Sequence, residues 1–344
     1  MVLEILCEGN PYQIGHAHGS NAKEQIRSSI EFYNGMFQKT SKMDWAAVRR
    51  LALEDFQGVI QRKWPAYMQE MQGIADGAGL DVGDIIALNV RSEIAFGLFS
   101  DGCTSLSWHS DGKAYVCQNW DWMEEQKPNV VLLHIKQEGK PTIKLLTESG
   151  QLGKIGLNSA GVGLCVNAIR AYGMDPTRLP IHIAWRMVLE CSSKDEAVAK
   201  LEKYGLASSC HTLIADPTGA VGIEWSSIDF QKLYADSKGR VCHSNHYLLD
   251  HPGVTDTNWL TDSTPRAKRI CDISEKCDVK DLTVPAIQEL FKDETGLPGA
   301  ICRMQEGEST AATLFNIVTD LVEKKAYVTL GRPTAPEGNL VLSF

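Results

Sequence analysis

The residues best suited to chemistry lie around Cys103, in the run Asp101-Gly102-Cys103-Thr104. A thiol with an ordinary pKa of about 8.5 needs a base or a positive neighbour to become a thiolate. If the bond between Gly102 and Cys103 is cut, Cys103 carries a free α-amine with a pKa of about 7.7 to 8.0. That amine is a general base on the nucleophile's own residue, as in enzymes with an N-terminal threonine. Glycine suits such a cut, because it tolerates strained backbone angles and leaves its carbonyl open to attack. We therefore predict self-cleavage between Gly102 and Cys103.

A structural role is the alternative for this cysteine. A lone cysteine at the start of a strand is usually a small buried hydrophobic residue. Spacing alone does not separate that role from catalysis.

Two strand-like runs on either side of Asp111-Gly112 must position Cys103. Residues 104–109 and 114–122 are rich in β-branched, aromatic and small side chains, and Asp-Gly between two such runs is a strong hairpin signal. With Asp111 and Gly112 as the turn, Cys103 lies opposite Trp120, one residue from Asp121. Register leaves open whether Asp121 shares a face with Cys103, since one bulge would reverse it.

Further motifs run nearly from end to end of the chain. They are GNPYQIG at 9–15, HG at 18–19, LNVRSE at 88–93, DGCT at 101–104, QNWD at 118–121, GKIGLNSAGV at 153–162, NH at 245–246, ATLFN at 312–316 and GRP at 331–333. In their order and separations they resemble the isopenicillin N acyltransferase (acyl-coenzyme A:6-aminopenicillanic acid acyltransferase) family, self-processing N-terminal nucleophile hydrolases of the peptidase C45 type. The motifs are specific for the superfamily and much less so for the substrate.

The resemblance implies residue roles. Cys103 would be the self-cleavage nucleophile and then the acyl carrier, Asp121 would orient or stabilise the α-amine, and Asn245 would donate to the oxyanion. Removing one such donor typically lowers a rate by about 100-fold to 1000-fold. The predicted substrate-binding residues are Thr104, Trp120, Trp122, Ser226 and Thr310. No metal or cofactor is implied, and acyl-coenzyme A enters only as a substrate.

One stretch departs from the family pattern. Before ATLFN the family carries an arginine linked to catalysis, whereas this chain reads ESTA at 308–311. The nearest cation upstream is Arg303, and the sequence gives no ground to let it replace the missing arginine. The missing arginine counts against penicillin-forming activity but does not affect the chemistry predicted for Cys103.

Three functions follow. The first is an acyltransferase that moves an acyl group from an acyl-coenzyme A or an amide, through a Cys103 thioester, to an amine such as 6-aminopenicillanic acid. The second is an amide hydrolase of small N-acyl amines, in which water resolves the thioester; the missing arginine shifts weight towards it. The third is a non-catalytic scaffold, against which the intact Cys103, Asp121 and Asn245 speak.

Composition narrows the class of protein. The chain has 344 residues, 43% hydrophobic and 22% charged, as in ordinary globular proteins. A net charge of −9 argues against a nucleic-acid binder. Ten cysteines without a CxxC pair indicate reduced thiols. There is no signal-like start, no apolar stretch of membrane-spanning length and no SKL-type ending. We expect a cytosolic protein whose partners are small-molecule substrates and its own cleaved fragment, with neither nucleic acid nor membrane.

The remaining elements define the fold class. Apolar residues at helical spacing predict three or four helices before Cys103. Within that part, Arg91 and Glu93 are either a same-face pair that holds the precursor loop or a solvated surface pair. Strands with two inserted helices follow Cys103, and residues 247–283 read as a long polar surface segment. We predict an α+β protein with one domain over 1–344, a four-layer αββα sandwich as the family implies, cut into 1–102 and 103–344.

Overall fold

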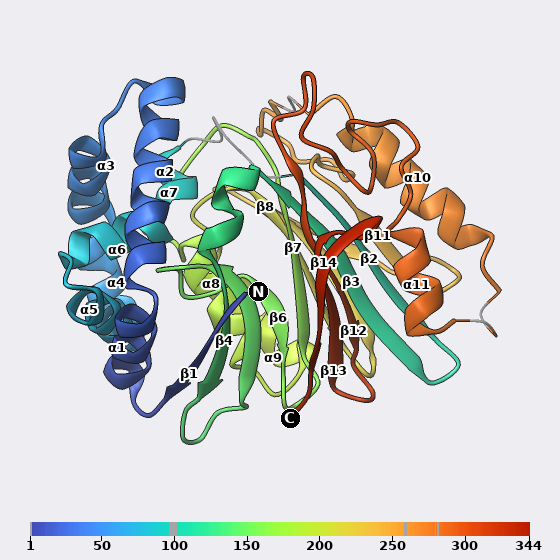
Figure 1. Cartoon of the computed structure of the whole chain (residues 1–344), viewed down its shortest axis with the longest axis horizontal. Helices are drawn as coiled ribbons and strands as arrows, with labels where there is room; N and C mark the ends of the chain where they lie inside the picture. Colours follow the sequence, from blue (N-terminus) through green and yellow to red (C-terminus); the bar gives the residue numbers. More distant parts are fainter. Residues whose placement is uncertain (1, 96–101, 258–259, 279, 281) are drawn as a thin grey trace.

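The structure is a computed structural model that describes residues 2–95, 102–257, 260–278, 280 and 282–344. Two β-sheets pack face to face, and helices cover both outer faces (Figure 1). In the described residues one sheet has eight strands in the order β1-β4-β5-β6-β7-β8-β9-β10, and the other has six in the order β11-β2-β3-β12-β13-β14. The layers therefore run helix, sheet, sheet, helix, which confirms the predicted αββα sandwich.

Each sheet collects strands from distant parts of the chain. The eight-stranded sheet contains β1 (Leu3–Glu8), β4 (Val130–Lys136), β5 (Ile143–Glu148), β6 (Ile155–Asn158), β7 (Gly163–Ala168), β8 (Cys210–Asp216), β9 (Gly219–Trp225) and β10 (Phe230–Tyr234). The six-stranded sheet contains β2 (Gly102–Ser110), β3 (Lys113–Trp122), β11 (Arg240–His243), β12 (Ala312–Asp320), β13 (Lys325–Arg332) and β14 (Ala335–Leu342).

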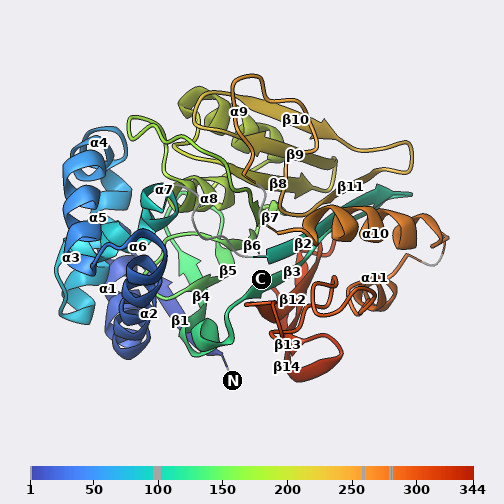
Figure 2. The ribbon, with the colours of Figure 1, turned by 90° about the horizontal axis from the view of Figure 1, so that it is seen from above.

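The two helical layers differ in size (Figure 2). The side of the eight-stranded sheet carries α1 (Pro11–Asn21), α2 (Lys23–Ser41), α3 (Trp45–Leu51), the π-helical turn η1 (Ala52–Gln57), α4 (Gly58–Lys63), α5 (Pro65–Ala78), α6 (Val82–Asn89), α7 (Arg91–Ile94), α8 (Ile181–Leu189) and α9 (Lys194–Tyr204). The side of the six-stranded sheet carries α10 (Ser263–Glu275) and α11 (Val284–Leu290), and a 3₁₀ turn, η2 (Glu124–Asn129), joins β3 to β4.

The β2–β3 hairpin has the predicted register. Cys103 pairs with Trp120 and Gly102 with Asp121, and the pairing is regular along the whole hairpin. Asp111 and Gly112 both have positive φ, at 50° and 74°, as the two-residue turn of a right-twisted hairpin requires. No bulge intervenes, so neighbouring side chains alternate between the two faces of the sheet.

The alternation places Cys103 and Asp121 on opposite faces. Cys103 and Trp120 belong to the core between the sheets. Leu106 and Cys117 belong to the second core, beneath α10 and α11. Thr104 and Asp121, each one residue from a core-facing neighbour, therefore face the helices.

Buried charges join the first helices to the eight-stranded sheet. Arg91 lies 2.8 Å from Glu148, which also receives Lys154 at 2.8 Å. Glu93 accepts the backbone N–H of Ile181 at 2.7 Å. The alternative of a solvated surface pair is therefore wrong, because Arg91 and Glu93 are both buried and each has a partner beyond the helix.

Glycines allow α1 and α5 to touch along their backbones. A Cβ atom on Gly15 would lie 1.9 Å from the carbonyl oxygen of Glu70, and one on Gly73 would lie 2.2 Å from that of Tyr12. Gly19 lies against α5 in the same way, with the equivalent distance 2.1 Å to the Ile74 oxygen. Small residues four apart are thus what lets this helix pair approach so closely.

We expect Gly15→Ala to lower the free energy of unfolding by at least about 1 to 3 kcal/mol, because α1 and α5 must separate to admit the methyl group. Gly35→Ala in α2 is the matched control. No atom lies within 4 Å of its added Cβ, so the exchange should raise stability by about 0.4 to 1 kcal/mol. Urea denaturation of both variants measures the difference, and equal shifts would contradict the packing explanation.

Two segments differ from the sequence-based expectation. Residues 247–283 are not a surface segment throughout, since they contain α10, whose Ala267, Ile270 and Ser274 are buried at helical spacing. Strand β14 was not foreseen, because Pro336 and Gly338 disfavour strands and the strand is a largely exposed edge.

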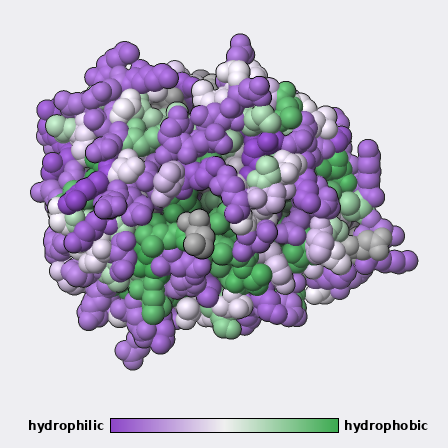
Figure 3. Space-filling model, in the orientation of Figure 1, coloured by the Kyte–Doolittle hydropathy of each residue, from purple (hydrophilic) through white to green (hydrophobic). Residues whose placement is uncertain are grey.

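The outer surface is mostly hydrophilic in the orientation of Figure 1, with hydrophobic side chains gathered near the middle of that face (Figure 3). None of the helices that the structure describes combines the length and the hydrophobicity needed to cross a membrane.

Candidate active site

Asn245 holds the backbone of Cys103. The N–H of Cys103 donates to Asn245 Oδ1 at 2.9 Å, and Asn245 Nδ2 donates to the carbonyl oxygen of Ala168 at 3.0 Å. Strand β11 pairs with β2 as far as His243 opposite Ser105. Beyond that point the Asn245 side chain takes the place that a carbonyl of β11 would otherwise fill. The predicted residue therefore lies at Cys103, the predicted nucleophile, on the side of its nitrogen.

Arg266 of α10 holds the other side of the cysteine. Its Nη1 donates to the carbonyl oxygen of Cys103 at 2.6 Å and to Thr104 Oγ1 at 3.1 Å, and its Nη2 donates to Asn245 Oδ1 at 2.8 Å. A guanidinium only donates hydrogen bonds. Arg266 thus fixes which end of the Asn245 amide faces Cys103: the oxygen points towards it and the NH₂ group points away.

Asp121 lies against Gly102. Its Oδ1 accepts the Thr313 hydroxyl at 2.6 Å, and its Oδ2 lies 4.0 Å from Arg303 Nε. A Cβ atom on Gly102 would lie 3.1 Å from Asp121 Oδ2 and 3.2 Å from Arg303 Nη1. Glycine at 102 is therefore what lets the carboxylate and the guanidinium approach the bond that precedes Cys103.

Acidic and basic side chains alternate in the contacts next to Gly102. Asp262 binds Arg266 Nε at 2.9 Å through one oxygen and forms an ion pair with Arg303 through the other. Burial raises the pKa of Asp121 to about 6, against the opposing effect of Arg303 and Arg266. Burial and the charge of Arg266 lower the pKa of Arg303. Two cations and two carboxylates thus surround the backbone of Gly102 and Cys103 on the helix side.

Arg303 reaches the site although the motif before ATLFN lacks an arginine. Its N–H donates to Thr313 Oγ1 at 2.9 Å, and its carbonyl oxygen accepts the Thr313 N–H at 3.2 Å. The chain therefore returns across ten residues and places Arg303 beside Asp121. Its position along the sequence gave no sign of this return.

Arg266 was missed because 247–283 was read as polar surface. A helix-start signal was present, with Asp262 and Ser263 before Pro265 and then buried Ala267 and Ile270. That periodicity would have found the helix. The partners of Arg266 could not have been found in the same way, since they come from β2 and from the segment after β11.

Three predicted substrate-binding residues lie on the hairpin itself. Trp120 is directly opposite Cys103, and Trp122 follows on the same face and meets Phe32 edge to face, with ring centroids 6.2 Å apart. Thr104 faces the helices and is bound by Arg266. The two tryptophans therefore share the face of the thiol, whereas Thr104 does not.

Ser226 and Thr310 lie apart from this group. The Ser226 hydroxyl donates to Asp229 Oδ1 at 2.5 Å and accepts the N–H groups of Ile228 and Asp229, which uses its single hydrogen and both lone pairs. Thr310 is exposed just before β12. Among the described residues no hydrogen bond or ion pair joins Ser226 or Thr310 to Cys103, Asp121 or Asn245, and their substrate role stays a prediction.

A small recess opens one strand beyond Trp120. It has a volume of about 200 Å³, and its apolar lining includes Val130, Leu314 and Phe315. Phe315 packs on Trp120 with ring centroids 5.3 Å apart. The recess therefore adjoins the aromatic neighbour of the nucleophile.

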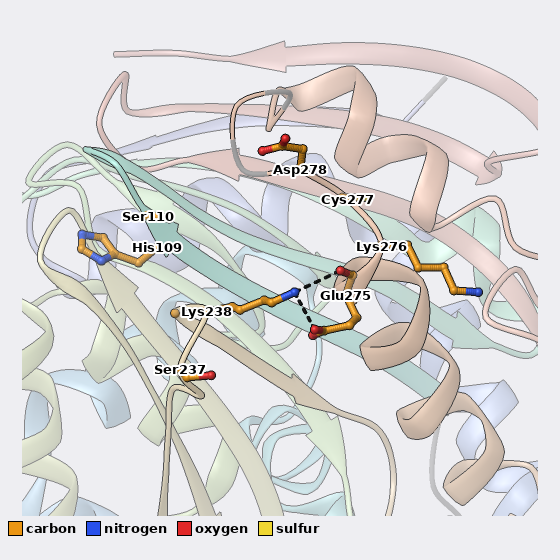
Figure 4. Close-up of a pocket in the computed structure, with 9 residues that line it drawn as sticks. His109, Ser110, Ser237, Lys238, Glu275, Lys276, Cys277 and Asp278 are labelled. Carbon is orange, nitrogen blue, oxygen red and sulfur yellow. Dashed lines mark hydrogen bonds and ion pairs between the residues drawn. The ribbon is translucent and has the colours of Figure 1, made fainter.

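A larger cleft of about 600 Å³ lies elsewhere, beside His109 and Ser110 at the turn end of the hairpin. Figure 4 shows Lys238 pointing across it to Glu275, with which it forms an ion pair of 2.5 Å. Six residues of extended strand, about 20 Å, separate His109 from Cys103. This cleft is thus distant from the candidate site. Within the described residues no cluster of His, Cys, Asp and Glu could hold a metal ion.

Sequence comparison adds the family. The profile of the family described as acyl-coenzyme A:6-aminopenicillanic acid acyl-transferase matches residues 108–335. The 40 kDa form of acyl-coenzyme A:6-aminopenicillanic-acid-acyltransferase from Emericella nidulans is 41% identical over 348 residues, which cover 100% of this chain and 96% of that protein. The chain belongs to this acyltransferase family. The match with the Emericella relative spans Cys103, whereas the acyltransferase profile begins five residues after it and includes Asp121, Asn245, Arg266 and Arg303.

Solved structures agree on the fold of this acyltransferase family member. The conjugated bile acid hydrolase from Clostridium perfringens superposes with a TM-score of 0.51 at 12% identity, over 70% of this chain and 92% of that chain. A second variant of the same hydrolase gives a TM-score of 0.50 with the same coverage. This likeness concerns the fold alone.

Proposed function

We propose that the protein is an acyltransferase that cuts its own chain before Cys103. It then carries an acyl group on the Cys103 sulfur from a coenzyme A thioester to an amine such as 6-aminopenicillanic acid. The arrangement of Asn245, Arg266 and the Asp121–Arg303 pair around the Gly102–Cys103 bond is the observation that carries this proposal. Family membership supports the choice of donor and acceptor.

Self-cleavage comes first. The Cys103 sulfur attacks the Gly102 carbonyl carbon, the bond from that carbon to the Cys103 nitrogen breaks, and the nitrogen takes up a proton. Water then hydrolyses the resulting thioester, which leaves a carboxylate on Gly102 and an α-amine on Cys103. Asn245 Oδ1, which binds the Cys103 N–H in the intact chain, is placed to bind that amine, and Asp121 on the other side stabilises its protonated form.

Acyl transfer uses the same atoms. The α-amine takes the proton of the Cys103 thiol, the sulfur attacks the carbonyl carbon of the donor thioester, and coenzyme A leaves with a proton. The acceptor amine then attacks the carbonyl carbon of the Cys103 thioester and gives a proton to the α-amine. The new amide bond forms, the bond from that carbon to sulfur breaks, and the sulfur takes up the proton. We assign Asn245 Nδ2 as donor to the oxyanion of both steps, as the family resemblance implies, since Asn245 Oδ1 is occupied by the Cys103 N–H and Arg266 and Nδ2 is the donor end of the amide. Dividing one displacement into two lowers the barrier of each.

The proposal includes the finer calls on partners and location. No cofactor takes part, because the thioester of the donor supplies the activated acyl group. Fragments 1–102 and 103–344 remain together as a heterodimer. Location in the cytosol is supported by ten cysteines, none of which forms a disulfide in the part of the chain that the structure describes.

Intact-mass measurement tests the proposal, with Cys103→Ala as control. We expect the wild type to give two fragments, the second beginning at Cys103, and the variant to give the full-length chain. Incubation with an acyl-coenzyme A should add one acyl group to the second fragment, and 6-aminopenicillanic acid should then remove it.

The outcomes separate the functions. An uncleaved wild type that takes up no acyl group would overturn the enzyme proposal. An adduct that decays equally fast with and without the amine would favour the amide hydrolase, because water would then be the acceptor.

A further inference from the structure

A buried cluster of charge lies behind Asn245, and the proposed reaction does not use it. Glu224 of β9 is fully buried, and each of its carboxylate oxygens has two donors. Oε1 lies 2.8 Å from His243 Nε2 and 2.7 Å from the N–H of Leu248. Oε2 lies 3.2 Å from His251 Nε2 and 3.1 Å from the N–H of Leu249. One side chain thus holds both ends of the segment 243–251.

Hydrogen bonds hold both histidine rings at two points. His243 Nδ1 lies 2.8 Å from the carbonyl oxygen of Ser244, and its Nε2 faces Glu224. His251 Nδ1 lies 3.0 Å from Asp229 Oδ1, and its Nε2 also faces Glu224. Each ring is therefore held at both nitrogens, and Glu224 is the partner that the two rings share.

Other titratable groups pack around the cluster. His211 stacks on His243 with ring centroids 3.6 Å apart and an angle of 13°. Its pKa is lowered by burial and by the His243 charge, so it packs as a neutral ring. His246, on the same segment, has its pKa lowered by burial and then by His243. The Tyr247 ring packs on His251 with centroids 4.1 Å apart.

Asn245 lies between the two anchors. His243 is two residues before it, Leu248 is three residues after it, and its own N–H donates to Ser263 Oγ at 2.8 Å. Glu224 belongs to the eight-stranded sheet, whereas β11 belongs to the six-stranded sheet. The cluster therefore fixes, across the sandwich, the segment that presents the Asn245 amide to Cys103.

We propose that Glu224, His243 and His251 are positioning residues that keep Asn245 at Cys103. The inference rests on the proposed function of Asn245. Loss of the Glu224 carboxylate removes the partner that both rings and the N–H groups of Leu248 and Leu249 share, which releases both ends of the segment. Acyl transfer should therefore weaken, while substrate binding is largely retained.

Glu224→Gln tests the proposal, because glutamine keeps the size of the side chain but replaces one acceptor oxygen by an NH₂ group, which can only donate. We expect kcat at neutral pH to fall by about 100-fold with KM nearly unchanged, since a displacement of about 1 Å at a reacting group can cost that much.

Glu70→Gln is the matched control. Glu70 is equally buried, with Arg186 at 2.7 Å, and lies in α5 away from Asn245. It should lose thermal stability and keep both kcat and KM. If the two variants lose the same activity, or if Glu224→Gln keeps the wild-type kcat, the positioning role is refuted.

Nitrogen NMR of ¹⁵N-histidine protein gives a readout that does not depend on activity. We expect the Nε2 signals of His243 and His251 to shift in Glu224→Gln and to stay in place in Glu70→Gln. Unshifted signals in Glu224→Gln, with an active wild type, would refute the positioning network alone. Shifted signals in Glu224→Gln, with a wild type that transfers no acyl group, would refute the proposed function and leave the network intact.

Discussion

Arg266→Met is expected to lower both self-cleavage and acyl transfer by at least about 1000-fold. The guanidinium donates to the Cys103 carbonyl and to Asn245 Oδ1, so its loss frees the nucleophile and turns the oxyanion donor at the same time. Removing a single oxyanion donor already costs about 100-fold to 1000-fold. Asp262 would also lose one of its two buried partners, at about 3 to 5 kcal/mol of folding stability.

Arg269→Met on the same helix is the control. Arg269 is partly exposed and pairs with Asp293 at 2.5 Å, an ion pair worth about 0 to 1 kcal/mol. It should keep wild-type rates, measured as the appearance of the two fragments and of the acyl adduct.

Arg266→Lys keeps the prediction testable if the methionine variant does not fold. An ammonium restores a charge near Asp262 but cannot serve three acceptors in the plane of a guanidinium. The lysine variant should therefore fold and remain slow. Wild-type rates in folded Arg266→Lys would show that the planar contacts are unimportant.

Asp121→Asn is expected to separate stability from activity. Burial raises the pKa of this carboxyl from 3.8 to about 6. The folded protein therefore binds the proton more tightly than the unfolded chain does, and the resulting stability is complete below about pH 4 and lost as the pH rises through 6. The difference corresponds to roughly 3 kcal/mol at neutral pH. Asparagine has no proton to lose, so the variant should be more stable than its parent at pH 7 by up to that amount.

Denaturation between pH 4 and pH 7 checks this expectation, in a Cys103→Ala background that keeps the chain intact. Asp121→Asn should flatten the decline of stability with pH, whereas Asp195→Asn, at an exposed position, should leave it unchanged. With Cys103 restored, Asp121→Asn should process and transfer about 100-fold more slowly, since the neutral amide no longer stabilises the α-ammonium group. An unchanged pH slope would show that Asp121 is not the group responsible.

Sequence patterns predicted those parts of the site that depend on local rules. The Asp111-Gly112 turn set the pairing of Cys103 with Trp120, because a two-residue hairpin leaves one register. The same register places Asp121 opposite Gly102, on the face of the sheet that the Cys103 thiol does not share. The sequence left this face open, because a single bulge would have reversed it. The four layers followed from helices before the hairpin and strands after it, together with the family resemblance.

The charged residues around the hairpin could not be predicted in this way. Arg303 arrives through backbone pairing with Thr313, and Arg266 arrives on a helix that was read as surface. Each contact joins residues far apart in the chain, so no local spacing encodes it. The buried partners of Arg91 and Glu93 were missed for the same reason: exposure is a property of the assembled layers.

The parallel pairing of β1 with β4 bears on how a cut after Gly102 would be detected. Residues 1–102 supply an edge strand of the eight-stranded sheet, and their Arg91 is bound to the buried Glu148. The two pieces should therefore elute from gel filtration as one particle and melt in one transition, and only denaturing methods would reveal the break. A polypeptide begun at Cys103 would lack part of its own sheet, so we expect the N-terminal portion to stay bound after a cut.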